Sequence, residues 1–533
     1  MKLLRKFLIL SHRYLGIAIS LLVMMWFATG IVMMYAGGMP RLTPELRLER
    51  MPALDLSRVQ LTPAEAIESA ELSFPPERIS LSTVMERPAY RLAVGRTMTV
   101  FADDGEILDE VTLAQATTIA SRFMTLPEDR FTYVGTLTRT DQWTLAQGRQ
   151  LPFYKFTVDD GDGTELYVSA RTGEVTLVTS RSGRVLAWIG TIPHWLYFNA
   201  LRLNQPLWYR IVVWTSTLAC IVALLGLVLG ITQWRRSTPF RVAASIPYAG
   251  WMRWHYITGV VFGFFTLTFA FSGLLSMEPY DWTNATGLEV DPDVFKGGPM
   301  DPERFGPMNA SAWDQLVGDR QIKEVEFAWI QDAPYYVVRH TPAAAAAEAR
   351  RERLHQPYGV TGRNEPDRVL VAAGTLAIKN EPFTVDSLVT RLKAALPDVP
   401  IADYELLSEY DSYYYSRGGQ TPLPVLRVRF EDPAQTWVYI DPEMSQVLAQ
   451  IHRLNRVERW LYNGFHSLDF AFWYDKRPLW DIGMIALCLG GLASSGIGLA
   501  LGVKRMRRAA TRTAKLLVPA GSPEVRQPTE SKA

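Results

Sequence analysis

Residues 188–208 read WIGTIPHWLYFNALRLNQPLW, and residues 460–480 read WLYNGFHSLDFAFWYDKRPLW. The two stretches share identical residues at a constant offset of 272 positions. The pairs are Trp188/Trp460, His194/His466, Leu196/Leu468, Phe198/Phe470, Pro206/Pro478, Leu207/Leu479 and Trp208/Trp480. The offset continues in the apolar runs that follow, where Gly226 and Gly230 match Gly498 and Gly502. Identities at one fixed offset seldom arise by chance, so the sequence predicts two duplicated halves.

Four apolar stretches dominate the hydropathy pattern, at 14–36, 208–233, 255–277 and 480–503. About 20 apolar residues cross a bilayer core, and a helix satisfies its own backbone hydrogen bonds there. The first stretch follows MKLLRK but is longer than the apolar part of a typical signal peptide. We therefore expect four retained transmembrane helices.

The basic residues beside these stretches predict the orientation. Cytoplasmic loops of membrane proteins are enriched in lysine and arginine. Such residues precede the first span, lie between the second and third, and follow the fourth: Lys2, Arg5, Lys6, Arg13; Arg235, Arg236, Arg241, Arg253; Lys504, Arg505, Arg507, Arg508. We expect a multi-pass protein of a bacterial inner membrane, with both termini in the cytoplasm and two large regions in the periplasm.

The expected division of the chain follows from these spans. It comprises a first transmembrane helix (1–37), a periplasmic region (38–187), an interfacial segment with the second helix (188–234), a cytoplasmic loop (235–254), the third helix (255–277), a second periplasmic region (278–459), an interfacial segment with the fourth helix (460–503) and a disordered cytoplasmic tail (504–533).

Both periplasmic regions have α+β patterns. Thr62-Pro63 resembles a capped helix start. Residues 89–108 alternate in hydropathy around a D-G turn, and 425–430 with 436–441 form another expected strand pair. Residues 340–364 resemble an insertion with a short exposed helix.

Composition excludes several classes of protein. The 533 residues carry a net charge of +1, which does not favour a nucleic-acid partner. Two cysteines are too few for a disulfide scaffold, a cysteine-ligated zinc site or a four-cysteine iron–sulfur cluster. The C-x-x-C-H haem-attachment signature and nucleotide-binding loops are absent from the sequence.

Four of the seven histidines occupy duplicated positions beside the spans: His12, His194, His255 and His466. His12 begins HRYLG and His255 begins HYITG. Ionisable residues at membrane depth usually have a partner or ligand, and two imidazoles are a natural axial set for haem iron. Topology pairs His12 with His255 near the cytoplasm and His194 with His466 on the outer side. The alternative is that each histidine only anchors a helix at the membrane interface.

With these motifs the chain resembles the PepSY-associated transmembrane family. The resemblance rests on the two His-x-x-x-Gly segments, on IPHWLYF and GFHSLDF, and on the PepSY-like outer segments TPAEAIESAE, ELYVSARTGEV and VYIDPEMSQVL. Some members look like di-haem inner-membrane reductases of ferric siderophores. The resemblance therefore implies two b-type haems held by His12, His255, His194 and His466.

Two functions remain open from the sequence. The first is electron transfer from a cytoplasmic reductase or quinol to a ferric siderophore or ferric chelate in the periplasm, with no separate catalytic residue predicted. The alternative is a non-catalytic PepSY membrane protein that binds a periplasmic partner or regulates a protease. A transporter is disfavoured because the spans carry almost no charge at mid-membrane.

Overall fold

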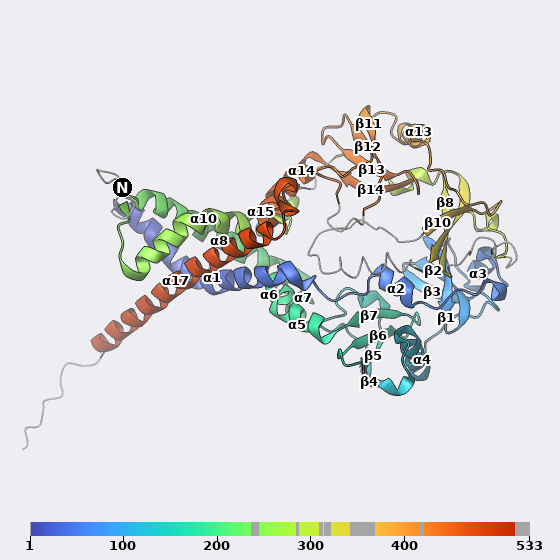
Figure 1. Ribbon diagram of the computed structural model, residues 1–533, viewed down its shortest axis with the longest axis horizontal. Coiled ribbons are helices and arrows are strands. Elements are labelled where there is room, and N and C mark those ends of the chain that lie inside the picture. The colour runs from blue at the N-terminus through green and yellow to red at the C-terminus, as the bar shows by residue number, and fades with distance from the viewer. Residues whose placement is uncertain are drawn as a thin grey trace, which may run out of the picture.

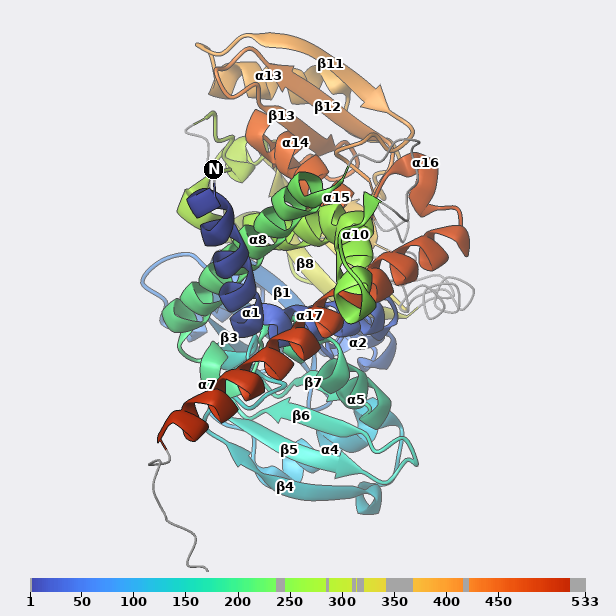
Figure 2. The same cartoon turned by 90° about the vertical axis from the view of Figure 1, so that its left-hand side faces the viewer.

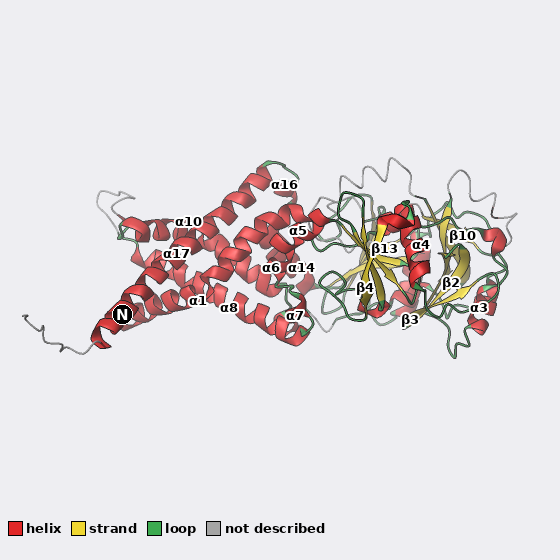
Figure 3. Ribbon diagram, turned by 90° about the horizontal axis from the view of Figure 1, so that it is seen from below, coloured by secondary structure: helices red, strands yellow, loops and turns green. Residues whose placement is uncertain are grey.

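The computed structural model describes residues 2–235, 245–283, 287–308, 313, 321–341, 368–415 and 421–517. Long helices fill one end of the molecule and β-sheets the other (Figures 1 and 3). Nearly all of the expected insertion at 340–364 lies outside the described residues.

Four helices form the helical end: α1 (Lys2–Ala36), α8 (Gln205–Gln233), α10 (Gly250–Leu275) and α17 (Leu479–Leu517). Within the described residues, these four are long and apolar enough to cross a membrane. Helix α1 packs against α17, and α10 packs against both α8 and α17. Figure 2, which views this end of the molecule, shows α17 crossing the others obliquely. The four expected spans are thus present as one bundle.

Two helix boundaries differ from the expected ones. Helix α10 begins at Gly250 rather than at 255, so His255 lies inside the helix. Helix α17 continues to Leu517, whereas we expected a disordered tail from residue 504. Residues 504–517 contain arginine, lysine, alanine and leucine but neither glycine nor proline. Their high helix propensity extends the span beyond its apolar part.

The largest sheet combines strands from both halves of the chain. Its order is β10-β9-β8-β1-β2-β3. The strands are β1 (Arg78–Val84), β2 (Arg87–Val94), β3 (Arg96–Phe101), β8 (Ile322–Ile330), β9 (Ala333–His340) and β10 (Arg368–Ala372). Strands β1 and β8 pair antiparallel at its centre, with Leu81 opposite Val325. The two outer regions are therefore joined through one sheet, although the sequence suggested a separate region for each half.

Two four-stranded sheets flank this shared sheet and lie on opposite sides of the molecule (Figures 1 and 2). One contains β4 (Phe131–Leu137), β5 (Phe153–Val158), β6 (Glu165–Ser169) and β7 (Val175–Thr179), with helix α4 (Leu113–Met124). The other contains β11 (Ile401–Leu407), β12 (Val425–Phe430), β13 (Trp437–Asp441) and β14 (Gln446–Ile451), with helix α13 (Val385–Ala395). Strands β12 and β13 confirm the strand pair expected at 425–430 and 436–441.

Local signals in the outer regions also have the expected result. Thr62 caps helix α3 (Pro63–Ser69) in a capping box with Glu65. Strands β2 and β3 form a hairpin whose turn places Gly95 at φ +71°. A second turn at Asp104-Gly105 returns Ile107 to bridge Val100.

Short elements connect the sheets to the bundle and to one another. The helices are α2 (Pro44–Arg50), α5 (Arg181–Ile189), α6 (Thr191–Trp195), α7 (Asn199–Arg202), α14 (Arg453–Arg459), the π-helix η7 (Trp460–Gly464), α15 (Phe465–Ser467) and α16 (Ala471–Tyr474). Single 3-10 turns are η1 (Leu56–Arg58), η2 (Glu128–Arg130), η3 (Gly148–Gln150), η4 (Pro279–Asp281), η5 (Pro292–Phe295) and η6 (Pro302–Arg304).

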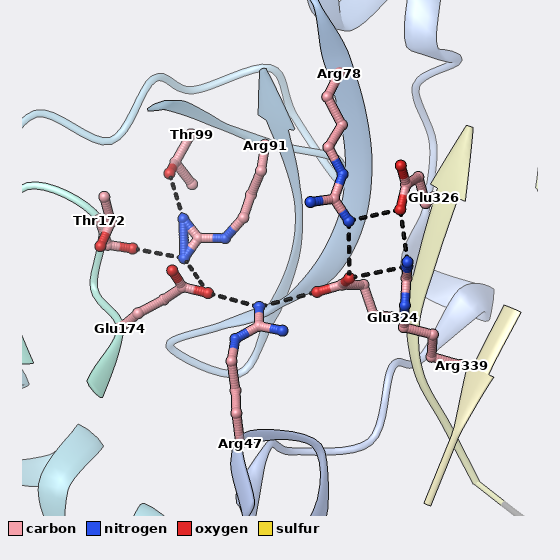
Figure 4. A network of polar contacts seen from close by, with 9 residues as sticks. All are labelled: Arg47, Arg78, Arg91, Thr99, Thr172, Glu174, Glu324, Glu326 and Arg339. Carbon is pink, nitrogen blue, oxygen red and sulfur yellow. Dashed lines mark hydrogen bonds and ion pairs between the residues drawn. The ribbon is translucent and has the colours of Figure 1, made fainter. Parts of the chain in front are cut away.

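A partly buried network of ion pairs joins the two halves beside the β1–β8 seam (Figure 4). Arg47 of α2 contacts Glu174 at 3.0 Å and Glu324 of β8 at 2.9 Å. Glu324 also contacts Arg339 of β9 at 3.1 Å, and Glu174 contacts Arg91 of β2 at 2.8 Å. Because the contacts alternate in charge across the seam, each buried ion has an opposite partner.

Candidate functional site

His12 of α1 and His255 of α10 form one histidine pair. We call it the inner pair, after the cytoplasmic side that the sequence predicts for it, and the pair of His194 and His466 the outer pair. The ring centroids of His12 and His255 are 6.2 Å apart. Nδ1 of His12 lies 3.0 Å from the carbonyl oxygen of Val222 in α8, and Nδ1 of His255 lies 3.1 Å from that of Ser494 in α17. A carbonyl only accepts, so each Nδ1 carries the hydrogen and each Nε2 keeps its lone pair for another bond.

Glycines make room for these two rings. A Cβ atom on Gly226 would lie 2.9 Å from Cε1 of His12, and one on Gly498 would lie 2.9 Å from Cε1 of His255. The structure shows that the groups approaching these glycines are the imidazole rings.

The outer histidine pair has the same separation. His194 in α6 and His466 in α15 have ring centroids 6.2 Å apart. Nδ1 of His194 lies 2.9 Å from the Thr29 hydroxyl oxygen, and Nδ1 of His466 lies 2.9 Å from that of Ser272. Both hydroxyls donate their own hydrogen to a helix carbonyl. Each hydroxyl oxygen can therefore accept the Nδ1–H bond, which again leaves Nε2 available.

Two tryptophans of the duplicated motif fix the short helices that carry this outer pair. The indole N–H of Trp208 donates to the carbonyl of Trp195 at 2.9 Å, and that of Trp480 donates to the carbonyl of Ser467 at 3.1 Å. Both short helices then end in a left-handed leucine, Leu196 at φ +52° and Leu468 at φ +49°. A leucine in the left-handed region of backbone conformation lowers stability by on the order of 1 kcal/mol or more. The repeated motif therefore encodes a defined turn after each histidine.

Each pair has the separation that one shared metal ion would require. An imidazole nitrogen binds a transition metal at about 2 Å, and it lies about 1.1 Å from the ring centre given C–N bonds of about 1.3 Å. Two axial imidazoles on one metal would thus have ring centres about 6 Å apart. The observed 6.2 Å matches this value in both pairs.

The ligand set favours haem over zinc. In the described part of the chain, no three histidine, cysteine, aspartate or glutamate side chains gather in a group. Two imidazoles with hydrogen-bonded Nδ1 atoms are an axial haem set, whereas a closed zinc site needs four ligands. The residues present therefore fit haem at both pairs.

Helix α1 connects the two sites. It carries His12 of the inner pair and Thr29, which binds His194 of the outer pair. Seventeen residues of helix correspond to about 25 Å along the axis. Near the outer site, the ring of Phe269 lies 6.2 Å from both Phe27 and His466.

The other two histidines that the structure describes, His340 and His452, do not join these pairs. His340 is buried on β9. His452 precedes α14 and its Nδ1 lies 3.0 Å from the Thr436 hydroxyl. His355 lies outside the described residues.

A family comparison covers the first three of the four long helices. A family model described as "PepSY-associated TM region" matches residues 9–373. The chain belongs to this family. The matched segment of this membrane protein includes His12, His194 and His255, whereas His466 lies beyond it. No curated protein matches the chain.

A cavity of about 1330 Å³ lies between the sheets and the short helices α14 and η7. Strands β8, β9, β10 and β14 line it on the sheet side, and α14 and η7 line it on the bundle side. Among its lining side chains are four tyrosines and four arginines: Tyr413, Tyr414, Tyr415, Tyr462, Arg78, Arg339, Arg368 and Arg459. The Tyr462 ring lies 5.3 Å from the ring of His466. The cavity thus reaches the outer pair through one aromatic side chain.

Two carboxyl groups meet at the edge of this cavity. Glu458 of α14 lines it and forms a side-chain hydrogen bond with Glu278, which follows α10. Burial, followed by the charge of Glu278, raises the pKa of Glu458 to about 7. The sequence analysis missed this pair. The internal repeat gives no signal for it, because position 186, which matches Glu458, is a leucine.

Replacing Glu458 by glutamine is expected to make the protein more thermostable at about pH 8 but not near pH 4.5. Burial in the folded state disfavours the ionised form of Glu458. Protonated Glu458 therefore makes its full contribution to stability below its ordinary pKa of 4.5, and this contribution is lost as the pH rises through about 7 and the group ionises. Melting temperatures at both pH values measure this. The exposed Glu77, replaced by glutamine, is the control and should shift neither value. An equal gain at both pH values would contradict the prediction.

Proposed function

We propose that the protein is a di-haem electron-transfer protein of the bacterial inner membrane that reduces ferric siderophores or other ferric chelates in the periplasm. Its two halves are duplicates, both termini lie in the cytoplasm, and both sheet-bearing regions lie outside. Electrons enter near the cytoplasm from a reductase or quinol. The observation that carries the proposal is the pair of matched imidazole couples, each with ring centroids at 6.2 Å.

The histidines would hold two b-type haems, His12 with His255 and His194 with His466. The haems would supply reversible one-electron chemistry near either side of the bilayer. The chain's own residues orient the imidazoles: carbonyls at the inner pair and hydroxyls at the outer pair accept the Nδ1–H bonds. Such partners would fix the orientation of the imidazole rings and raise their basicity toward iron.

The cavity supports the reductase proposal over a purely structural role. Its volume would admit a chelate of drug size or larger. Its tyrosines, and its arginines in addition to their ion pairs with Glu326, Asp441 and Asp469, would offer hydrogen-bond donors to an acceptor with anionic or carbonyl oxygens. Tyr462 separates this space from His466 by a single ring, which gives a short path for an electron.

The decisive experiment is a pyridine-haemochrome assay on the purified full-length protein. We expect two haems per chain and an absorption change in the Soret and α bands on reduction with dithionite. Subsequent addition of a ferric trihydroxamate should reoxidise the haem. A folded preparation without haem would falsify the proposal and favour the partner-binding or protease-regulating alternative.

A steric test can distinguish the inner site from the outer one. Gly226→Ala is expected to lower the occupancy of the inner haem, because the new Cβ would lie 2.9 Å from the His12 ring. Gly30→Ala places its Cβ at an ordinary 3.6 Å from the His194 ring and is the matched control. Haem content per chain measures both. Loss of haem in the control, with none in Gly226→Ala, would contradict this assignment.

A further inference from the structure

The outer end of the second half contains a polar cluster that has no counterpart in the first. The residues at the matched positions of the first half are Leu186 for Glu458 and Gly190 for Tyr462. The two halves share their histidines, yet only the second brings a carboxyl pair to the edge of the cavity. This difference indicates that the carboxyl pair has a function in the cavity, separate from the ligand role of the histidines.

The backbone conformations that position this cluster are energetically unfavourable. Tyr462 lies in the π-helix η7, a conformation often found at functional sites. On the opposite side, Glu278, Tyr280 and Asp281 all have positive φ, at 47°, 63° and 47°. Non-glycine residues persist in this region only where the surrounding structure holds them. The strained segment directs the Glu278 side chain toward Glu458, where the two hydrogen bond.

The neighbours of the carboxyl pair define its charge. Glu278 accepts a hydrogen bond from the backbone N–H of Thr283 at 3.3 Å, and Asn455 donates to Glu458. Tyr462 faces Glu458 and is hydrogen bonded to Ser276. Arg459 lines the same cavity but contacts Asp469 at 3.6 Å. Burial, and then repulsion from the charge of Glu278, raises the pKa of Glu458 to about 7, so this carboxyl keeps its proton to a higher pH than an ordinary glutamate.

We propose that the Glu278–Glu458 pair is the proton donor for the acceptor bound in the cavity. This inference rests on the proposed function. In a ferric chelate with oxygen ligands, the iron gains one electron through the outer pair and becomes ferrous. One iron–oxygen bond then breaks, its electron pair stays on the ligand oxygen, and that oxygen takes the proton from the carboxyl pair. The pair is left doubly ionised and regains a proton from water in the cavity.

The test compares two acceptors with the reduced full-length protein in detergent. A ferric trihydroxamate requires a proton as its ligand leaves, whereas ferricyanide accepts an electron alone. Under anaerobic conditions, the rate of haem reoxidation is followed at the Soret band from about pH 5.5 to about pH 8.5. The variants are Glu458→Gln and Glu278→Gln, with Glu405→Gln, an exposed carboxylate of β11 away from this cavity, as the control.

We expect each variant of the pair to slow reoxidation by the trihydroxamate at least about tenfold at about pH 6, as for loss of a general acid. The fall in wild-type rate as the pH rises through about 7 should disappear in both variants. Rates with ferricyanide should remain unchanged, and the Glu405→Gln protein should behave as wild type.

The contrary results separate the two proposals. A wild-type pH profile in Glu458→Gln, or equal slowing with both acceptors, overturns the proton donor while leaving the electron path intact. A wild-type protein that neither acceptor reoxidises overturns the proposed function, and this inference with it.

Discussion

Replacement of His194 by alanine is expected to lower the haem content from two per chain to one. The outer haem would lose an axial ligand and one wall of its site, whereas the inner pair lies about 25 Å away along α1. His466→Ala should give the same result, because the two rings form one couple. His12→Ala and His255→Ala should instead remove the inner haem. Pyridine-haemochrome stoichiometry measures all four variants.

The matched control is His340→Gln, since His340 is buried on a strand of the shared sheet and far in sequence from both couples. Its haem content should stay at two. The double variant His194→Ala/His466→Ala should retain one haem, like either single variant. If the double variant lost both haems, or if a single outer variant retained two, the pairing would be wrong.

Replacement of Glu324 by glutamine is expected to destabilise the outer region by about 3 kcal/mol, the cost of leaving buried charges unpaired. Its carboxylate is 5% exposed and contacts Arg47 and Arg339. Burial alone would raise its pKa, but these guanidinium groups hold the pKa of Glu324 below its usual value. The contribution of the ion-pair network to the free energy of unfolding is therefore present above about pH 4.5 and is lost as the pH falls below this value.

Thermal unfolding of the full-length protein at neutral pH, followed by near-ultraviolet circular dichroism, tests this prediction. The control is Glu405→Gln. The Glu405 side chain is 60% exposed and forms an ion pair with Arg427. Exposed ion pairs contribute about 0–1 kcal/mol, so its melting temperature should barely change. Equal shifts in the two variants would show that the seam does not depend on the network.

Much of this protein can be predicted from hydropathy and internal repetition. The four spans are predictable because a helix in lipid needs an uninterrupted apolar run, which hydropathy alone detects. The four histidines stand out because each has a twin, and the capping box at Thr62 is a local signal. The extension of α17 to Leu517 was missed because charged residues can continue a helix once it leaves the membrane.

Other features depend on contacts between residues distant in the chain. The sequence suggested which histidines form couples, but only the packing of α1, α10, α6 and α15 sets their rings 6.2 Å apart. Pairing of β1 with β8 across the halves has no local signal, since an exposed strand edge can accept many partners. Glu278 and Glu458 lie 180 positions apart and lack twins, so repetition could not find them. Local sequence therefore determines the spans and the candidate ligands, whereas tertiary packing determines the separations and hydrogen-bond partners that give those residues their chemistry.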